Sequence, residues 1–204
     1  MGCSFSGQVS ASSIYKNDHS WEEKAKWGKE LGVNTWGKEI VCMDTIHKHL
    51  FMGSRFSAQQ VIDNRTLTDQ YGNIYSTKKF YTVCVASERT CEYCVMSSRF
   101  SRYNIHDRAN QTDDFIAIAK QTAKQIRKKL RAGHHVLVHC HSGRNRSALA
   151  ILVYCASYTY MTYENALLQI RRHNSSRFSS QSTLQNGQFT TSVREQWNQL
   201  IAMK

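Results

Sequence analysis

Hydrophobic and polar positions along residues 46–204 follow two periods in turn, one typical of strands and one typical of helices. Short runs rich in β-branched and aromatic residues predict strands, and they lie at 49–53, 80–86, 101–105 (the weakest) and 135–139. Longer segments with apolar side chains three or four positions apart predict helices, and they lie at 112–132, 146–160, 162–173 and 190–203. Because strands and helices alternate, we expect an α/β fold with a central, mostly parallel, twisted sheet flanked by helices.

The segment before residue 46 has a different pattern. Residues 1–45 hold three of the four tryptophans and little sign of a strand. The stretch Ser20-Trp21-Glu22-Glu23 has the S-x-x-E form of a capping box and predicts a short helix that ends near Leu31. We therefore interpret residues 1–45 as an N-terminal extension that precedes one domain at 46–204. Further along, residues 175–188 are rich in Ser, Gln and Asn and predict a loop.

The charge of the chain favours anionic partners. There are 27 Lys and Arg against 15 Asp and Glu, a formal charge of +12, which suits nucleic acid, a membrane face or a phosphorylated substrate, although solubility alone accounts for it equally well. The longest unbroken apolar run, 148–156, has nine residues, whereas a membrane-spanning helix needs about 20. Seven cysteines without an evident disulfide framework favour a reducing compartment.

One segment combines a cysteine with the features of an anion-binding loop. In VLVHCHSGRNRSA, residues 136–148, a buried strand leads to Cys140, and Arg146 opens an apolar helix. The backbone N–H groups of such a loop and the positive end of the helix dipole bind anions. The loop between Cys140 and Arg146 is therefore predicted to bind phosphate, through His141, Ser142, Gly143, Arg144 and Asn145.

The residues of this segment have separate chemical roles in our interpretation. Cys140 is the candidate nucleophile, because backbone donors and a nearby guanidinium stabilise its thiolate. Arg146 is suited to bind two phosphate oxygens and the charge of an in-line transition state. The Ser147 hydroxyl can hydrogen-bond the sulfur when it leaves a phosphoenzyme, His139 orders the loop from behind, and Gly143 lets the backbone approach the phosphate.

The motif H-C-x5-R-S after a VLV strand resembles the protein tyrosine phosphatase superfamily, and the short core resembles its dual-specificity branch. The resemblance covers roughly Thr45 to Leu200. It implies a catalytic domain at 46–204 that hydrolyses phosphotyrosine and phosphoserine or phosphothreonine on proteins through a phosphocysteine intermediate. It also implies that no metal or organic cofactor takes part. The added loop that builds a deep pocket in the large tyrosine-specific members has no room here, which favours a shallow site.

Members of this family also use a general acid from a separate loop, about thirty residues before the cysteine. Asp107 stands 33 residues before Cys140, after a predicted strand, and the resemblance implies that it is this acid. Asp113 and Asp114 are alternatives, although acidic residues at the start of a helix are common as caps and as partners of the helix dipole.

Three other functions stay open at this stage. Members that act on phosphoinositides carry basic residues at the offsets of His141 and Arg144, so a phosphoinositide is the second expected substrate. Members that act on RNA 5′-triphosphates have asparagine before the arginine, as Asn145 does here, but usually lack the aspartate, so this activity ranks third and we expect no nucleic-acid partner. The third alternative is an inactive phosphoprotein-binding module, although the Cys, Arg and Asp that inactive members lose are all present.

The N-terminus carries a possible lipidation signal. Residues 1–6, MGCSFS, fit the myristoylation pattern M-G-x-x-x-[ST] at Gly2, with Cys3 placed for palmitoylation. Because two acyl chains hold a membrane stably, we expect peripheral anchoring of a cytoplasmic protein to the cytoplasmic face of a membrane in a eukaryotic host.

The remaining cysteines suggest two weaker hypotheses. Cys91 and Cys94 form a C-x2-C pair, but zinc needs two further ligands that nothing in the sequence supplies, so no metal site is expected. Some family members protect the catalytic cysteine by a reversible disulfide, and Cys84 on a neighbouring predicted strand is then a candidate partner for Cys140.

Overall fold

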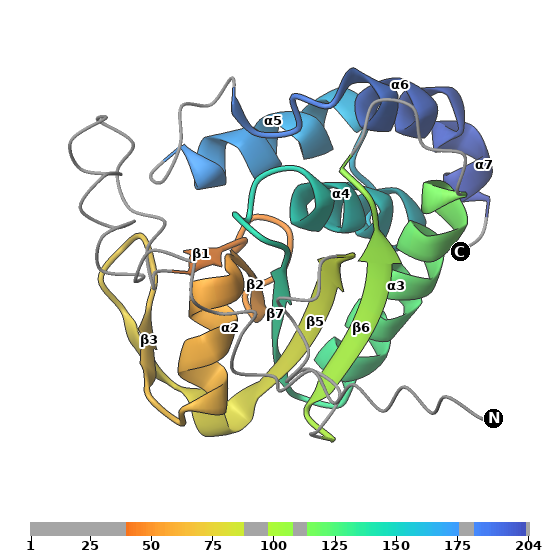
Figure 1. Ribbon diagram of the computed structural model, residues 1–204. Helices are drawn as coiled ribbons and strands as arrows, with labels where there is room; N and C mark the ends of the chain where they lie inside the picture. Colours follow the sequence, from red (N-terminus) through yellow and green to blue (C-terminus); the bar gives the residue numbers. More distant parts are fainter. Residues whose placement is uncertain (1–39, 88–97, 108–113, 176–181, 203–204) are drawn as a thin grey trace, which may run out of the picture.

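The computed structural model describes residues 40–87, 98–107, 114–175 and 182–202 (Figure 1). Its centre is a five-stranded sheet of order β1-β2-β7-β5-β6. These strands are Val41–Cys42 (β1), Leu50–Gly53 (β2), Phe80–Ala86 (β5), Phe100–Ile105 (β6) and His135–His139 (β7). The short strand β1 pairs antiparallel with β2, and all other neighbours in this sheet are parallel. A separate two-stranded sheet pairs Thr66–Thr68 (β3) with Ile74–Ser76 (β4). The predicted α/β fold with a mostly parallel sheet is confirmed.

Helices cover both faces of the central sheet (Figure 1). They are Arg55–Ile62 (α2), Phe115–Arg131 (α3), Arg146–Tyr158 (α4), Tyr163–Asn174 (α5), Gly187–Glu195 (α6) and Trp197–Ile201 (α7), with a 3-10 turn at Thr77–Lys79 (η2). Helices α3 and α4 pack against each other and against the sheet on one face, while α2 packs on the opposite face. Helix α5 lies against α4, and α6 and α7 also contact α4.

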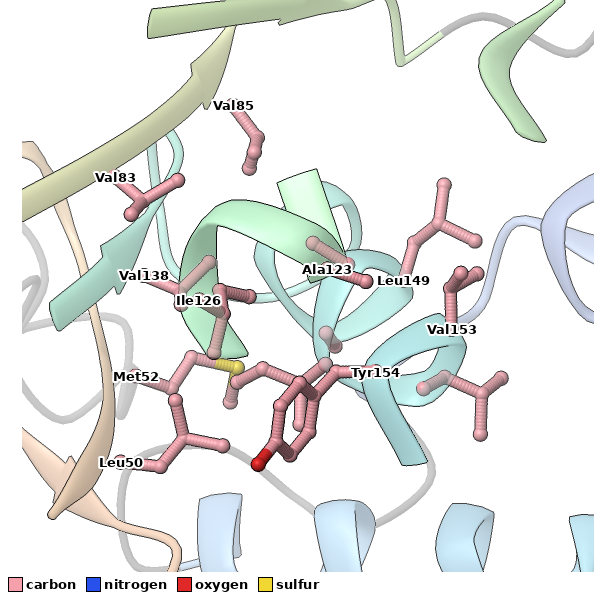
Figure 2. Packing of buried hydrophobic residues seen from close by; sticks show 14 of the residues in the cluster. Leu50, Met52, Val83, Val85, Ala123, Ile126, Val138, Leu149, Val153 and Tyr154 are labelled. Carbon is pink, nitrogen blue, oxygen red and sulfur yellow. The ribbon is translucent and has the colours of Figure 1, made fainter. Parts of the chain in front are cut away.

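The main core lies between the sheet and helices α3 and α4. Alternate side chains of the strands point to this face, because successive residues of a strand face opposite sides. Figure 2 shows side chains of β2, β5 and β7 opposite those of the two helices, among them Met52, Val83, Val138, Ile126 and Leu149. All five are fully buried. This packing places the end of β7 and the start of α4, where the candidate phosphate loop lies, in the interior of the domain.

The predicted elements are confirmed with shifted ends. Helix α3 begins at Phe115, because the side chain of Asp114 caps it by accepting a hydrogen bond from the Ala117 N–H at 2.8 Å. The single terminal helix predicted at 190–203 is wrong. The chain forms α6 from residue 187 and then α7, and Gln196 both ends the first helix and begins the second. The tail of the loop predicted at 175–188 therefore belongs to α6.

The N-terminal extension lies almost entirely outside the described residues, as does the helix predicted near residues 20–31. Its last part is described, and there Ile40, Val41 and Met43 are fully buried in the core. Strand β1 of the sheet begins at Val41, earlier than the predicted domain start at residue 46. Whether residues 1–39 form an appendage stays a prediction.

Candidate active site

The predicted strand, loop and helix are all present around Cys140. Strand β7 ends at His139, the loop follows, and α4 begins at Arg146. Within the loop, Gly143 has a φ of +74°, a left-handed conformation that side chains disfavour. This conformation directs the Gly143 N–H to the sulfur of Cys140, with an N–Sγ distance of 3.3 Å. The backbone of the loop therefore turns inward toward the thiol.

The thiol of Cys140 is buried among polar groups. The residue is 1% exposed, and the Ser147 hydroxyl lies 3.5 Å from its Sγ in the first turn of α4. His139 is fully buried behind the loop, and its Nδ1 lies 3.3 Å from the carbonyl oxygen of Cys140. Backbone N–H and hydroxyl donors of this kind stabilise negative charge on sulfur. The structure thus brings Cys140, Ser147 and His139 together, and the roles assigned to them stay predictions.

Arg146 connects the phosphate loop to the end of β6. The residue is 3% exposed, and its Nη1 lies 3.5 Å from the carbonyl oxygen of Ile105. Its Nε lies 3.8 Å from Oδ2 of Asp107. A guanidinium held in this way at the mouth of an N–H-lined loop is suited to bind two oxygens of a tetrahedral anion.

Asp107 is brought to the loop from β6, the strand at the far edge of the sheet. Its carboxylate accepts hydrogen bonds from Nδ2 of Asn145, with distances of 3.4 Å to Oδ1 and 3.3 Å to Oδ2. Its side chain is 32% exposed, so a substrate can reach it. Of the two alternative acids, Asp114 caps α3, and Asp113 lies outside the described residues.

Three segments outside the motif hold the loop by its backbone. The Arg55 N–H of α2 donates to the carbonyl oxygen of His141 at 3.1 Å, and the Leu184 N–H donates to that of Arg144 at 3.3 Å. Buried Asn174, in the last turn of α5, donates from Nδ2 to the carbonyl oxygen of Gly143 at 3.3 Å. Sequence reasoning missed all three, because no local pattern marks an asparagine or a backbone N–H as a partner of a distant loop.

The other residues predicted to bind phosphate belong to the same loop. His141, Ser142 and Arg144 are half-buried there. The Nε of Arg144 is buried and has no hydrogen-bond partner within the described ranges. The Nε of Arg55, from the adjoining start of α2, is in the same condition. Two guanidinium groups near the loop thus each have a buried donor that is not satisfied within the described ranges.

The other described cysteines differ in environment from Cys140. Burial raises the pKa of Cys42 to about 11 and also raises the pKa of Cys155, so both are poor nucleophiles at neutral pH. Cys84 lies on β5 directly opposite His139 of β7, and neither Cys84 nor Cys140 forms a disulfide in the described part of the chain. The reversible disulfide between these two cysteines stays a prediction.

Two sequence hypotheses fall partly or wholly outside the described residues. The acylation sites Gly2 and Cys3 and the pair Cys91 and Cys94 lie there. In the part that the structure describes, no group of His, Cys, Asp and Glu side chains is arranged to hold a metal ion. No helix in that same part is long and apolar enough to cross a membrane.

Fold and site together define an α/β protein with a candidate phosphate-binding loop and a thiol at its base. The family model for the catalytic domain of dual-specificity phosphatases matches residues 68–199. The chain belongs to this family of protein phosphatases. The match includes the candidate acid, the loop and helices α3 to α6. A comparison with curated proteins found no match.

Solved structures of low sequence identity share the fold. Human DUSP28 is 15% identical, with 80% of this chain and 95% of that chain covered and a TM-score of 0.53. The human tyrosine phosphatase-like serine/threonine/tyrosine-interacting protein is 17% identical, with 82% and 100% covered and a TM-score of 0.55. OH1 of the Orf virus, described as a tyrosine phosphatase with triple substrate specificity, is 18% identical, with 78% and 86% covered and a TM-score of 0.53.

Proposed function

We propose that this protein hydrolyses phosphotyrosine and phosphoserine or phosphothreonine on proteins through a phosphocysteine at Cys140. One observation carries the proposal. The Sγ of Cys140 lies at the base of the loop, 3.3 Å from the Gly143 nitrogen and 3.5 Å from the Ser147 hydroxyl, with Arg146 and Asp107 at the loop's far end. A thiolate, an anion-binding loop and a carboxylic acid are the groups that phosphoryl transfer to sulfur requires.

In the first step the substrate phosphate occupies the loop, where backbone N–H groups and the Arg146 guanidinium bind its oxygens. The Cys140 thiolate attacks phosphorus in line with the leaving oxygen. The S–P bond forms as the P–O bond breaks, and protonated Asp107 gives its proton to the leaving oxygen. Arg146 and the N–H groups stabilise the negative charge spread over the three equatorial oxygens.

In the second step water hydrolyses the phosphocysteine. The Asp107 carboxylate accepts a proton from the water as its oxygen attacks phosphorus, and the P–S bond breaks. The Ser147 hydroxyl, already within reach of Sγ, donates a hydrogen bond to the departing thiolate. Inorganic phosphate then leaves the loop, and neither a metal nor an organic cofactor is part of the proposal.

A phosphoinositide is the second candidate substrate. It is favoured by the buried Nε of Arg144, which lacks a hydrogen-bond partner in the described part of the chain. The half-buried guanidinium of Arg144 also adds positive charge to the loop, which suits a substrate with several phosphate groups better than a single phosphoester.

The test is phosphate release from a phosphotyrosine peptide, a phosphothreonine peptide, a phosphoinositide and a 5′-triphosphate RNA. Cys140→Ser should lower release by more than about 1,000-fold, because no other group replaces the nucleophile. The variant should still bind inorganic phosphate, as a shift in melting temperature. The matched control is Cys42→Ser, since this thiol donates to the Lys48 carbonyl oxygen at 3.9 Å, away from the loop.

The outcomes separate the candidate functions. The proposal is supported if phosphate release is lost in Cys140→Ser and kept in Cys42→Ser. The substrate that is hydrolysed fastest then decides between a phosphorylated protein and a phosphoinositide. Folded, reduced protein that binds phosphopeptide but releases no phosphate would instead indicate a binding module.

A further inference from the structure

Asn145 joins three separate segments of the chain through one side chain. Its Nδ2 donates to both carboxylate oxygens of Asp107, at 3.4 and 3.3 Å, and so contacts the segment that follows β6. Its Oδ1 accepts a hydrogen bond from the Gln185 N–H at 3.1 Å, in the segment that follows α5. Its own backbone lies in the phosphate loop, immediately before Arg146, and the residue is 9% exposed.

These contacts fix the orientation of the amide. The Gln185 N–H can only donate, so the Asn145 atom facing it must be the carbonyl oxygen. The NH₂ group of Asn145 must then face Asp107, where it meets a carboxylate that can only accept when ionised. The backbone carbonyl of Asn145 accepts from the Leu149 N–H at 2.8 Å and anchors the residue to the first turn of α4.

The Nε of Arg146 lies farther from Asp107 than the amide of Asn145 does. The Nε of Arg146 lies 3.8 Å from Oδ2 of Asp107, beyond hydrogen-bond distance. In the proposed reaction this guanidinium also turns its donors to the phosphate oxygens. The side-chain amide of Asn145 does not have to bind phosphate oxygens. It can keep its hydrogen bond to one carboxyl oxygen of Asp107 while the other oxygen gives its proton to the leaving group.

We propose that Asn145 is the positioning residue for the general acid, holding the Asp107 carboxyl group over the phosphate loop. The proposal rests on the function proposed above, because it concerns the proton that Asp107 gives to the leaving oxygen. In this role the side chain of Asn145 acts through Asp107, whereas its backbone belongs to the loop that binds the phosphate.

The test uses two aryl phosphates that differ in their need for an acid. The nitrophenolate of 4-nitrophenyl phosphate leaves with little protonation, whereas the basic phenolate of phenyl phosphate needs a proton. Asn145→Ala should lower kcat/KM for phenyl phosphate by about 10-fold or more, because a misplaced acid transfers its proton poorly, and for 4-nitrophenyl phosphate by less than about 3-fold. In an Asp107→Asn background, Asn145→Ala should have no further effect on either substrate.

Two further variants complete the design. Asn145→Asp has nearly the same shape and keeps an acceptor for the Gln185 N–H, but it lacks the donor and should show the same loss, selective for phenyl phosphate. Asn174→Ala is the matched control, because this asparagine also donates to the loop, at the Gly143 carbonyl oxygen, but within the described ranges it makes no hydrogen bond to Asp107. Its losses should be equal for both substrates and in both backgrounds.

The results distinguish the two proposals. If Asn145→Ala lowers kcat/KM equally for both substrates, in the wild-type and in the Asp107→Asn background, then Asn145 only orders the phosphate loop. If it does not lower kcat/KM at all, then Asp107 is positioned without Asn145. Either result, with turnover that still depends on Cys140, overturns the role of Asn145 alone. If Cys140→Ser keeps the wild-type rate, the proposed function itself fails.

Discussion

Gly143 gives the phosphate loop a backbone conformation that other residues hold only at a cost. Its φ of +74° lies in the left-handed region, where an L residue loses about 1–2 kcal/mol. Gly143→Ala should therefore lower the free energy of unfolding by about 1–2 kcal/mol. It should also lower kcat/KM by at least about 10-fold, because alanine disfavours the backbone conformation that directs this N–H to Cys140. Urea unfolding and steady-state kinetics measure the two effects.

Gly133 provides the matched control for this prediction. It follows α3 with a φ of +80°, and a Cβ placed there meets nothing within 4 Å. Gly133→Ala should show a similar loss of stability with unchanged kcat/KM. Equal activity in the two variants would mean that the loop does not depend on the conformation of Gly143.

Sequence reasoning at the residue scale succeeded where the residues are close together in the chain. Cys140, Arg146 and Ser147 lie in one short stretch, and their mutual geometry follows from a strand, a tight loop and a helix start. Asp107 contacts the loop whereas Asp114 caps α3, and the role of Asp107 as general acid stays a prediction. Asn174 was not foreseen, since its bond to the loop depends on how α5 packs beside α4.

Among the elements, β2, β7 and α2 approach one another closely at Gly53. A Cβ on this residue would lie 2.8 Å from the Cβ of Ser57 and 2.9 Å from Cδ1 of Leu137. Ser57 also belongs to the capping box that starts α2 with Ser54. Gly53→Ala should lower the free energy of unfolding by about 1–3 kcal/mol, because the helix must move away from the sheet.

The same substitution should reduce activity, because Arg55 at the start of α2 holds the backbone of the loop through its N–H. Chemical denaturation and phosphate release from one preparation test both effects. A Gly53→Ala protein with wild-type stability would show that α2 can shift without cost.

Element prediction failed where the periodic signal is weak. Helix α2 buries the polar residues Ser57 and Gln60 alongside Ala58 and Val61, so its apolar face is not visible in the sequence. The terminal helix divides at Gln196, and Trp197 then packs edge-on against Tyr163, with ring centroids 5.4 Å apart. Contacts with other helices, rather than the helical period itself, determine that division.

At the scale of the whole molecule, a histidine cluster lies at the end of the sheet opposite the phosphate loop. The His49 ring is 5.9 Å from that of His47 and 4.8 Å from that of His135. Burial, with a smaller effect from His49, lowers the pKa of His47 and of His135 in the folded protein. Burial also lowers the pKa of His173, partly offset by Asp44.

These lowered pKa values predict a loss of stability in mild acid. Below about pH 6.5 these histidines become protonated in the unfolded chain while they are still neutral in the folded protein. Because the unfolded chain then binds more protons, acid favours unfolding. Above this pH the histidines are neutral in both states and add no pH dependence. The melting temperature should therefore be level just above neutral pH and fall from about pH 6.5 downward.

The variant His135→Phe assigns this effect to the cluster. The His135 ring stacks on Phe80 with centroids 5.2 Å apart, and phenylalanine keeps that stacking while removing one titrating group. Its melting temperature should fall less steeply between about pH 6.5 and pH 5.5. A slope equal to that of the wild type would place the acid sensitivity elsewhere.

Acylation at Gly2 and Cys3 stays a prediction, and so does the location at the cytoplasmic face of a membrane that depends on it. The reversible disulfide between Cys84 and Cys140 also stays a prediction. The formal charge of +12 is compatible with an anionic membrane surface as well as with phosphorylated substrates.

The sequence by itself determined the local chemistry of this protein. A cysteine, a flexible glycine and an arginine at short spacing, between a buried strand and an apolar helix, are enough to predict an anion-binding loop with a thiol, because neighbours in the chain build it. Tertiary structure decided what meets that loop, and of these residues only Asp107 was predicted, from the family resemblance. β6 beside β5 brings Asp107 to it, α5 against α4 brings Asn174, and the segment before α6 orients Asn145. These contacts join residues far apart in the chain, so they depend on how the whole core packs and leave no local pattern in the sequence.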